Sequence, residues 1–379
     1  MTSTYLDYNA TAPVRPEAAD AVACALRIGG NPSSVHANGR LARAAVEKAR
    51  GEVAALVGVK PGSVTFTSGG TEANALAVQS AVAGGSRRLI VGAADHPSLI
   101  EGASATGCWT ELWPVDGEGL ADLGWLRVRL GAWKAADGRP FVALSLANGE
   151  TGVIQPTAEI GAIVHEAGGW LHLDAVQAAG KIAVDFSALG GDTMALSAHK
   201  LGGPQGVGAL VAGTRATVAR RQFGGGQESG RRAGTENVPG IAGFGAAASA
   251  ALRDLPKVAA QATWRDELAV RVKDAGAEVL GAGAERLPQT LCFAATGFGS
   301  ELQVMNLDLA GVMVSAGAAC LSGKVKASPV VEAMGRADLA PYSLRISGGW
   351  ASTEADWKRC GDVWVEAYAR SLSRKREVA

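Results

Sequence analysis

Hydrophobic residues recur in two alternating patterns up to about residue 252. Apolar positions at helical spacing predict helices over 17–27 and 41–56, with Pro16 near the first start and Asn38-Gly39 before the second. Short runs rich in β-branched residues predict strands at 64–67, 88–91, 142–146, 170–173, 194–196 and 207–211, and helix-length stretches separate most of them. This alternation predicts an α/β fold, in which helices wrap a mainly parallel sheet.

The pattern changes after about Leu252. A charged helical stretch is followed by strand candidates at 291–293 and 312–314 and by a closing helix from about Thr353. A chain of 379 residues is long enough for about two domains. We therefore predict a large domain over 16–252 and a smaller α+β domain formed by 1–15 and 253–379.

Charge and composition exclude several classes of function. Lys+Arg and Asp+Glu both total 36, so no net basic field favours nucleic acid or anionic lipid. The first residues lack the basic and apolar regions of a signal peptide, and no apolar run is long enough to span a bilayer. We expect a cytoplasmic protein that binds neither membrane nor nucleic acid.

Motifs for metals, disulfides and nucleotides are missing from the sequence. The five cysteines are odd in number and make no C-x-x-C pair, which indicates reduced thiols. There is no H-E-x-x-H spacing, no G-x-G-x-x-G after a strand and no G-x-x-x-x-G-K-[ST]. We therefore predict no metal site and find little support for a dinucleotide or nucleoside triphosphate site.

One lysine and one carboxylate point to a specific chemistry. Asp174 ends an apolar run, and Lys200 lies in a Ser-Ala-His-Lys segment that continues into Gly-Gly-Pro. An enzyme that uses pyridoxal phosphate (PLP) needs a lysine for a Schiff base, a carboxylate that keeps the pyridine nitrogen protonated, and donors for a phosphate. The lysine serves when burial or a cationic neighbour lowers its pKa. Asp174 and Lys200 are the predicted pair.

Other loops at strand ends carry residues suited to a phosphorylated ligand. Segment 68–74, which includes Gly70 and Thr71, lies between a predicted strand and a predicted helix, so its N–H groups and helix dipole favour an anion. The alternative is an ordinary turn with Thr71 or Ser68 as the N-cap. His96 is suited to stacking on a planar cofactor, or else to capping a helix.

The remaining histidines differ in their expected roles. His199 adjoins Lys200, where its ring is suited to holding a phosphate or the loop. His165 and His172 are expected on a helix and a strand, without a chemical role.

These motifs, taken in order along nearly the whole chain, resemble the cysteine desulfurases of the NifS/IscS type. That family consists of class V, fold-type I PLP enzymes with a seven-stranded main sheet. The segments that carry the resemblance are YLDYNAT at 5–11, NPSSVH at 31–36, TSGGTEAN at 67–74, NGETG at 148–152, DAVQ at 174–177, SAHK at 197–200, GGGQE at 224–228, RAGTEN at 232–237, and Cys320 ahead of LRIS at 344–347.

The resemblance implies a role for each matching residue. Lys200 would form the Schiff base and move protons, and Asp174 would pair with the pyridinium. The other implied cofactor contacts are Gln177 to the phenolic oxygen, His96 stacked on the ring, and Gly70, Thr71, Ser197, His199 and, from the other subunit of a homodimer, Thr235 at the phosphate. Asn148 and Arg345 would bind the substrate, Asn148 also lying against the cofactor and Arg345 forming a bidentate bond to the carboxylate.

Cys320 distinguishes a desulfurase from related transaminases. By the resemblance, its thiolate takes sulfur from L-cysteine, which leaves a persulfide on the enzyme and alanine as co-product, and the sulfur passes to an acceptor protein for iron–sulfur cluster assembly or another product. The small residues around Cys320 fit a mobile loop. The other cysteines are expected to pack as buried thiols: Cys24, Cys108, Cys292 and Cys360.

Three positions depart from the family pattern, and two other functions stay open. Ala318, Leu321 and Trp350 stand where relatives usually carry a serine, a small polar residue and an arginine. One alternative is another class V PLP enzyme, such as a selenocysteine lyase or an aminotransferase. The other is a sulfur-relay subunit without turnover.

Overall fold

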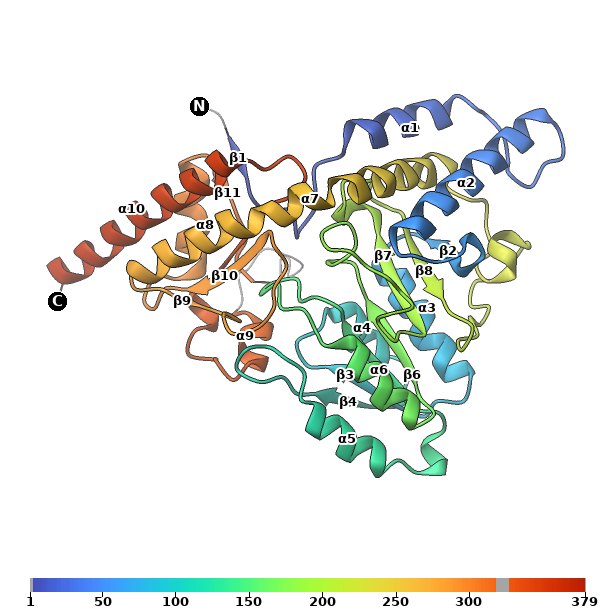
Figure 1. Ribbon diagram of the computed structural model, residues 1–379, viewed down its shortest axis with the longest axis horizontal. Coiled ribbons are helices and arrows are strands. Elements are labelled where there is room, and N and C mark those ends of the chain that lie inside the picture. Colours follow the sequence, from blue (N-terminus) through green and yellow to red (C-terminus); the bar gives the residue numbers. More distant parts are fainter. Residues whose placement is uncertain (1–2, 318–326, 379) are drawn as a thin grey trace.

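The computed structural model describes residues 3–317 and 327–378. Its largest sheet has seven strands in the order β2-β8-β7-β6-β5-β3-β4. Their bounds are β2 Val64–Thr67, β3 Arg88–Gly92, β4 Trp109–Trp113, β5 Phe141–Ser145, β6 Trp170–Asp174, β7 Thr193–Ser197 and β8 Gly208–Ala212. Neighbouring strands are parallel except where β8 pairs with β2 and β7. The predicted α/β fold with a mainly parallel seven-stranded sheet is confirmed (Figure 1).

Alternate residues along the strands face two separate apolar clusters, as the two-residue repeat of a strand requires. Ile90 and Val142 belong to the larger cluster, while Leu89 and Ala143 belong to a smaller one on the other face. The larger cluster is completed by helices α1 Pro16–Leu26, α2 Ala37–Leu56, α5 Leu123–Gly131, α6 Thr157–Glu166 and α7 Val238–Asp274. The smaller one is completed by α3 Gly70–Ala83 and α4 Pro97–Ser104. Both faces of the sheet are therefore covered by helices.

A second group of elements lies at the other end of α7 (Figure 1). Three antiparallel strands form a sheet in the order β12-β10-β9, and β1 pairs in parallel with β11. Their core includes Phe293, Leu344 and Trp364. The elements here are β1 Thr4–Tyr5, β9 Glu278–Val279, β10 Thr290–Ala294, α8 Ser300–Leu309, β11 Val312–Met313, α9 Pro329–Ala333, β12 Ser343–Ser347 and α10 Glu354–Val378.

Helix α7 joins the two groups without a break. Its first half packs in the larger cluster through Phe244 and Ala251, and its second half packs in the other core through Leu268 and Val272. The helix is therefore continuous across residues 252 and 253, where we predicted the boundary between the two domains. That division stays a prediction.

Several details of the fold differ from the sequence expectations: strands β1, β9 and β12 were not expected, and α7 begins before residue 252. Strand β4 was not expected, because it lies at the edge of the sheet and carries polar or exposed residues such as Trp109 and Glu111. Helix α2 begins at Ala37, four residues before the expected start, because the His36 side chain accepts a hydrogen bond from the Gly39 N–H and caps it. Within residues 3–317 and 327–378, none of the helices has the length and apolar character needed to cross a bilayer.

Candidate active site

Most of the predicted site residues line one cavity of about 290 Å³. The cavity lies beside the carboxyl ends of β5, β6 and β7, where ligands bind in open α/β sheets. Residues from the β12 sheet complete it. It brings together Gly70, Thr71, His96, Asn148, Asp174, Gln177, Ser197, His199, Lys200 and Arg345.

The predicted site residues not named in this group are Thr235 and Cys320. Thr235 is exposed, in a segment that does not line the cavity. Cys320 lies outside the described residues, as do Ala318 and Leu321. Of the other cysteines, Cys292 and Cys360 are buried as expected, whereas Cys108 is half-buried and Cys24 on α1 is exposed. The expectation of burial is wrong for Cys24, because α1 turns only residues such as Ala18 and Ala25 toward the core.

Asp174 is held by a buried asparagine on α3. The Asn74 amide nitrogen donates to Asp174 Oδ2 at 2.8 Å and to Ser98 Oγ at 2.9 Å. The Val176 N–H donates to the other carboxylate oxygen, Oδ1, at 3.0 Å. Asn74 is 1% exposed, so this carboxylate is fixed in a water-poor setting. Hydrogen bonds to both oxygens fix the orientation of the carboxylate.

His172 belongs to the same network, although the sequence assigned it no role. Its Nε2 lies 2.9 Å from Asn74 Oδ1, and its Nδ1 lies 2.9 Å from Thr193 Oγ1. Because the Asn74 amide nitrogen already donates elsewhere, Asn74 Oδ1 accepts from Nε2–H, and Thr193 donates to Nδ1. Burial lowers the pKa of His172 to about 3, so this ring is neutral. His172 is two residues before Asp174 on β6, and the period of a strand places both on one face.

His96 both caps a helix and lines the cavity. The Ser98 N–H donates to His96 Nδ1 at 3.1 Å at the start of α4. The helix cap that the sequence left open for His96 is confirmed, and its place at the cavity leaves stacking on a cofactor as a prediction. Burial lowers the pKa of His96, and Asp174 opposes that shift. The neutral ring suits stacking on a flat cofactor.

A second hydrogen-bonded set surrounds Lys200. The Lys200 amino group donates to the main-chain oxygens of Asn9 at 2.6 Å and Ala10 at 2.8 Å. Gln177 Nε2 also donates to the Asn9 main-chain oxygen, at 2.9 Å. Lys181, which the sequence did not single out, donates to Gln177 Oε1 at 2.6 Å and to Asn9 Oδ1 at 2.9 Å. Lys181 lies four residues after Gln177, and Asn9 lies within the YLDYNAT segment.

The start of α3 faces an adjoining hollow of about 350 Å³ that shares Gly70, Thr71, Ser197 and His199 with the cavity. Gly69 is the N-cap, and no side chain caps the helix. The alternative of a turn capped by Thr71 or Ser68 is therefore wrong. The first-turn N–H groups of a helix attract an anion. A Cβ at Gly70 would lie 2.7 Å from Val176 Cγ2, so this close approach requires glycine.

His199 is fixed beside this hollow by Thr11. Its Nδ1 lies 3.0 Å from Thr11 Oγ1. Burial, with help from Lys200 and Lys181, lowers the pKa of His199 to about 4. The ring is therefore neutral near pH 7 and can act as a hydrogen-bond donor without adding charge.

Arg345 reaches the cavity from β12. One of its terminal nitrogens donates to Asp7 Oδ1 at 2.7 Å and the other to the Gly149 main-chain oxygen at 3.2 Å. Its Nε is buried and has no hydrogen-bond partner in the described part of the chain. Asn148 Oδ1 accepts from the Glu150 and Thr151 N–H groups, and its amide nitrogen donates to the Ala94 oxygen at 2.9 Å.

A buried carboxyl group lies close to Arg345. Glu150 lines the cavity and accepts a hydrogen bond from Ser328 at 2.6 Å. Burial raises the pKa of Glu150, while Ser328 and Arg345 oppose that shift.

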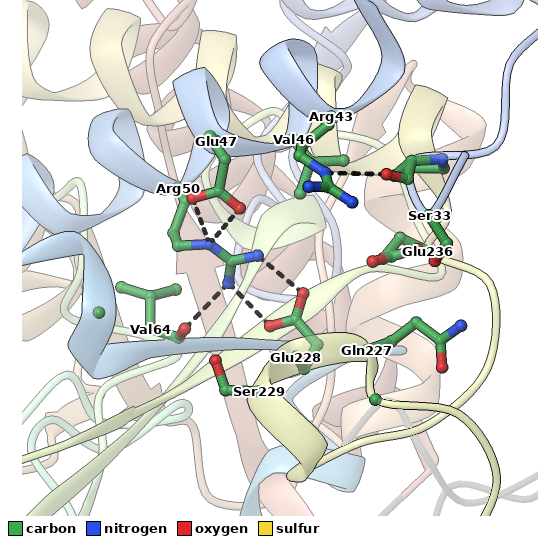
Figure 2. Close-up of a pocket in the computed structure, with 13 residues that line it drawn as sticks. Ser33, Arg43, Val46, Glu47, Arg50, Val64, Gln227, Glu228, Ser229 and Glu236 are labelled. Carbon is green, nitrogen blue, oxygen red and sulfur yellow. Dashed lines mark hydrogen bonds and ion pairs between the residues drawn. The ribbon is translucent and has the colours of Figure 1, made fainter. Parts of the chain in front are cut away.

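A buried ion pair holds the segment that leads to Thr235. Arg50 on α2 makes two parallel hydrogen bonds to Glu228, of 2.7 and 2.8 Å, and Glu228 also accepts from the Phe66 N–H. Figure 2 shows this pair in a separate pocket lined by α2, β2 and the turn at 227–229. Glu228 and Ser229 both have positive φ, at 49° and 56°, so the pair holds a strained turn in place.

Comparison with known proteins shows the class of this chain. Residues 4–359 match the family model described as aminotransferase class V. A cysteine desulfurase of a Frankia species is 38% identical over 99% of this chain and 94% of its own length. A cysteine desulfurase of Cereibacter sphaeroides is 39% identical over 96% of this chain and 95% of its own length. A solved NifS-like protein of Rickettsia africae superposes with a TM-score of 0.88 and 30% identity, covering 98% of this chain and all of that one.

The chain therefore belongs to the class V aminotransferase family of PLP-dependent enzymes. Within that family it belongs with the cysteine desulfurases, as its relatives of 38 and 39% identity and the resemblance of its motifs agree. The cavity fits the cofactor on its own chemistry. It offers a fixed carboxylate, a lysine amino group, an uncapped helix N-terminus and a neutral ring, which are the groups that PLP requires.

Proposed function

We propose that this protein removes sulfur from L-cysteine, releasing L-alanine and leaving a persulfide on Cys320. The observation that carries this proposal is that Asp174, Lys200 and Arg345, from three separate segments, line one cavity. The near full-length similarity to cysteine desulfurases supports the choice of substrate.

Bound PLP supplies an electron sink for charge that develops at the substrate's α-carbon. The residues of the chain hold and orient this cofactor and balance its charges. Asp174 would keep the pyridine nitrogen protonated, Gln177 would donate to the phenolic oxygen, and His96 would stack on the ring. The phosphate would take hydrogen bonds from Thr71, Ser197, His199 and the Gly70 end of α3.

Substrate binding falls to the residues that come from β12 and the 148–150 turn. Arg345 would bind the substrate carboxylate, and its buried Nε is the donor that supports this role. Asn148 would contribute its amide nitrogen. Lys200, in hydrogen-bond reach of two main-chain oxygens, would carry the proton between the α-carbon and the later carbon acceptor.

The sulfur transfer itself is a displacement at sulfur. The Cys320 thiolate attacks the substrate sulfur, an S–S bond forms, and the Cβ–S bond breaks. Its electron pair stays with the substrate carbon, which takes up a proton and becomes the methyl group of alanine. The persulfide would then pass to an acceptor protein for iron–sulfur clusters or another sulfur product.

We also propose a cytoplasmic homodimer in which Thr235 of each subunit reaches the phosphate of the other. The exposure of Thr235 supports this arrangement.

Product analysis tests this function. PLP-loaded protein with L-cysteine and a reductant is expected to release sulfide and alanine in equal amounts. Cys320→Ala should lower sulfide release on the order of a hundredfold or more, because none of the described residues that line the cavity is a cysteine. Cys24→Ala is the matched control, since Cys24 is an exposed thiol on α1, and its products should be unchanged. Undiminished products from Cys320→Ala would instead indicate a lyase that does not use this thiol.

A further inference from the structure

Lys181 is a buried lysine to which the proposed reaction gives no task. It is 5% exposed and lies seven residues after the end of β6. Its amino group donates to Gln177 Oε1 and Asn9 Oδ1. Among the described residues, no carboxylate oxygen lies within 4.0 Å of its amino nitrogen, so Lys181 forms no ion pair with them. Burial lowers the pKa of Lys181, and Lys200 and Arg345 lower it further. Burying an amino group costs free energy. A lysine kept at this position therefore indicates a role for the hydrogen bonds that it makes.

The neighbours of Gln177 allow only one orientation of its amide. The main-chain oxygen of Asn9 can only accept, and it receives a hydrogen bond from Gln177 Nε2 at 2.9 Å. On the other side, the Lys181 amino group donates to Gln177 Oε1 at 2.6 Å. Turning the amide over would set oxygen against oxygen at Asn9 and would lose the bond to Lys181.

Asn9 is held just as firmly. Its amide nitrogen donates to the Gly149 oxygen at 3.1 Å and to Thr290 Oγ1 at 3.0 Å, which leaves Oδ1 to face Lys181. The main chain of Asn9 in turn accepts from Lys200 at 2.6 Å. Lys181 therefore connects the amide of Gln177 to the segment that positions Lys200.

We propose that Lys181 is a positioning residue, which holds the Gln177 amide so that its N–H group, and not its oxygen, faces the phenolic oxygen of the cofactor. This inference rests on the proposed function. A phenolate oxygen only accepts, so a Gln177 amide turned over would replace an attraction by a repulsion. Lys181 acts through Gln177 and Asn9 and touches no reacting atom.

The test is the visible absorption of the PLP-loaded protein, titrated with pH, together with its affinity for PLP. Lys181→Met keeps the length of the side chain and removes its donors. We expect it to shift the titration midpoint in the same direction as Gln177→Ala and to weaken PLP binding by about two- to tenfold, the loss of one hydrogen bond. The double variant should match Gln177→Ala alone, because both changes remove one interaction.

Two further variants separate this role from simple packing. Lys48→Met, at an exposed position on α2, is the matched control and should leave the titration unchanged. Lys181→Arg keeps donors at the buried position, so its titration midpoint should lie close to that of the wild type. This variant also tests the proposal if Lys181→Met does not fold. An unchanged midpoint in folded Lys181→Met, or effects that simply add to those of Gln177→Ala, would overturn the inference. Wild-type protein without a bound-cofactor band would instead contradict the proposed function.

Discussion

Two buried asparagines, each 1% exposed, organise two different parts of the cavity. Asn74 binds the Asp174 carboxylate and the neutral His172 ring. Asn9 binds two amines, those of Lys181 and Lys200. One part of the cavity is therefore anionic and the other rich in amines. Even without a ligand, the cavity is polarised in the sense that suits a pyridinium at one place and a phenolate at another.

The two parts also differ in where their residues come from. Asn74, Asp174 and His172 belong to α3 and β6, which pack together on the main sheet. Asn9 instead gathers residues from the N-terminal segment, the turn at Gly149 and Thr290 of β10. Rigid elements fix the part around Asn74, whereas the part around Asn9 depends on contact between the seven-stranded sheet and the β12-β10-β9 sheet.

The largest effect is expected where the anionic part is broken. Asp174→Asn should lower alanine release by about a hundredfold to a thousandfold, because a fixed charge at the reacting ring is lost. Asp95→Asn is the matched control: it neutralises another buried carboxyl group, whose pKa burial raises to about 7, so that about half of it is already protonated near pH 7. Its activity should stay within about threefold of wild type. Equal losses in the two variants would contradict the assignment of Asp174.

A smaller effect is expected outside both parts, at the pair that holds the turn before Thr235. Glu228→Gln removes the buried anion of Arg50 and leaves only the exposed Glu47 carboxylate beside it, so it should lower the free energy of unfolding by about 2–3 kcal/mol, less than for a lone buried charge. Denaturant unfolding measures this change. Arg50→Met combined with Glu228→Gln should recover much of the loss, since no charge then stays buried alone; a double variant as unstable as Glu228→Gln would show that the charge is not the cause.

The smallest effect concerns the neutral ring behind Asn74. The pKa of His172 falls from its ordinary 6.5 to about 3 on folding, so the folded state binds fewer protons than the unfolded chain between those values. Stability from this group is present above pH 6.5 and is lost as the pH falls through the window. His172→Phe should reduce the slope of unfolding free energy against pH by up to about 1.4 kcal/mol per pH unit. An unchanged slope in denaturant unfolding between pH 4 and about pH 6 would mean that His172 is charged when folded.

The sequence predicted the sheet and the main site residues because these leave local signals. Strands such as β3 and β5 contain uninterrupted apolar runs, at 89–91 and 141–144, and Asp174 and Lys200 stand at or just after strand ends within distinctive segments. The roles of His172 and Lys181 left no such signal. Each depends on a partner, Asn74 or Asn9, that is distant in sequence and meets it only after folding.

Trp350 illustrates the same limit at a position that departs from the family pattern. Its Nε1 donates to the Pro13 main-chain oxygen at 2.9 Å, and the Arg15 guanidinium lies 5.2 Å from the centre of its ring. Arg15 also donates to the Leu201 oxygen, next to Lys200. Trp350 therefore packs against the segment that supports the lysine loop, which the sequence alone did not indicate.

A single turnover of PLP-loaded protein with L-cysteine and no reductant, followed by peptide mass spectrometry, tests the proposed sulfur transfer most directly. We expect one added sulfur atom on the peptide that contains Cys320, with one alanine released for each, and neither product from Lys200→Ala. Alanine without sulfur on Cys320, or sulfur carried by another cysteine, would contradict this transfer.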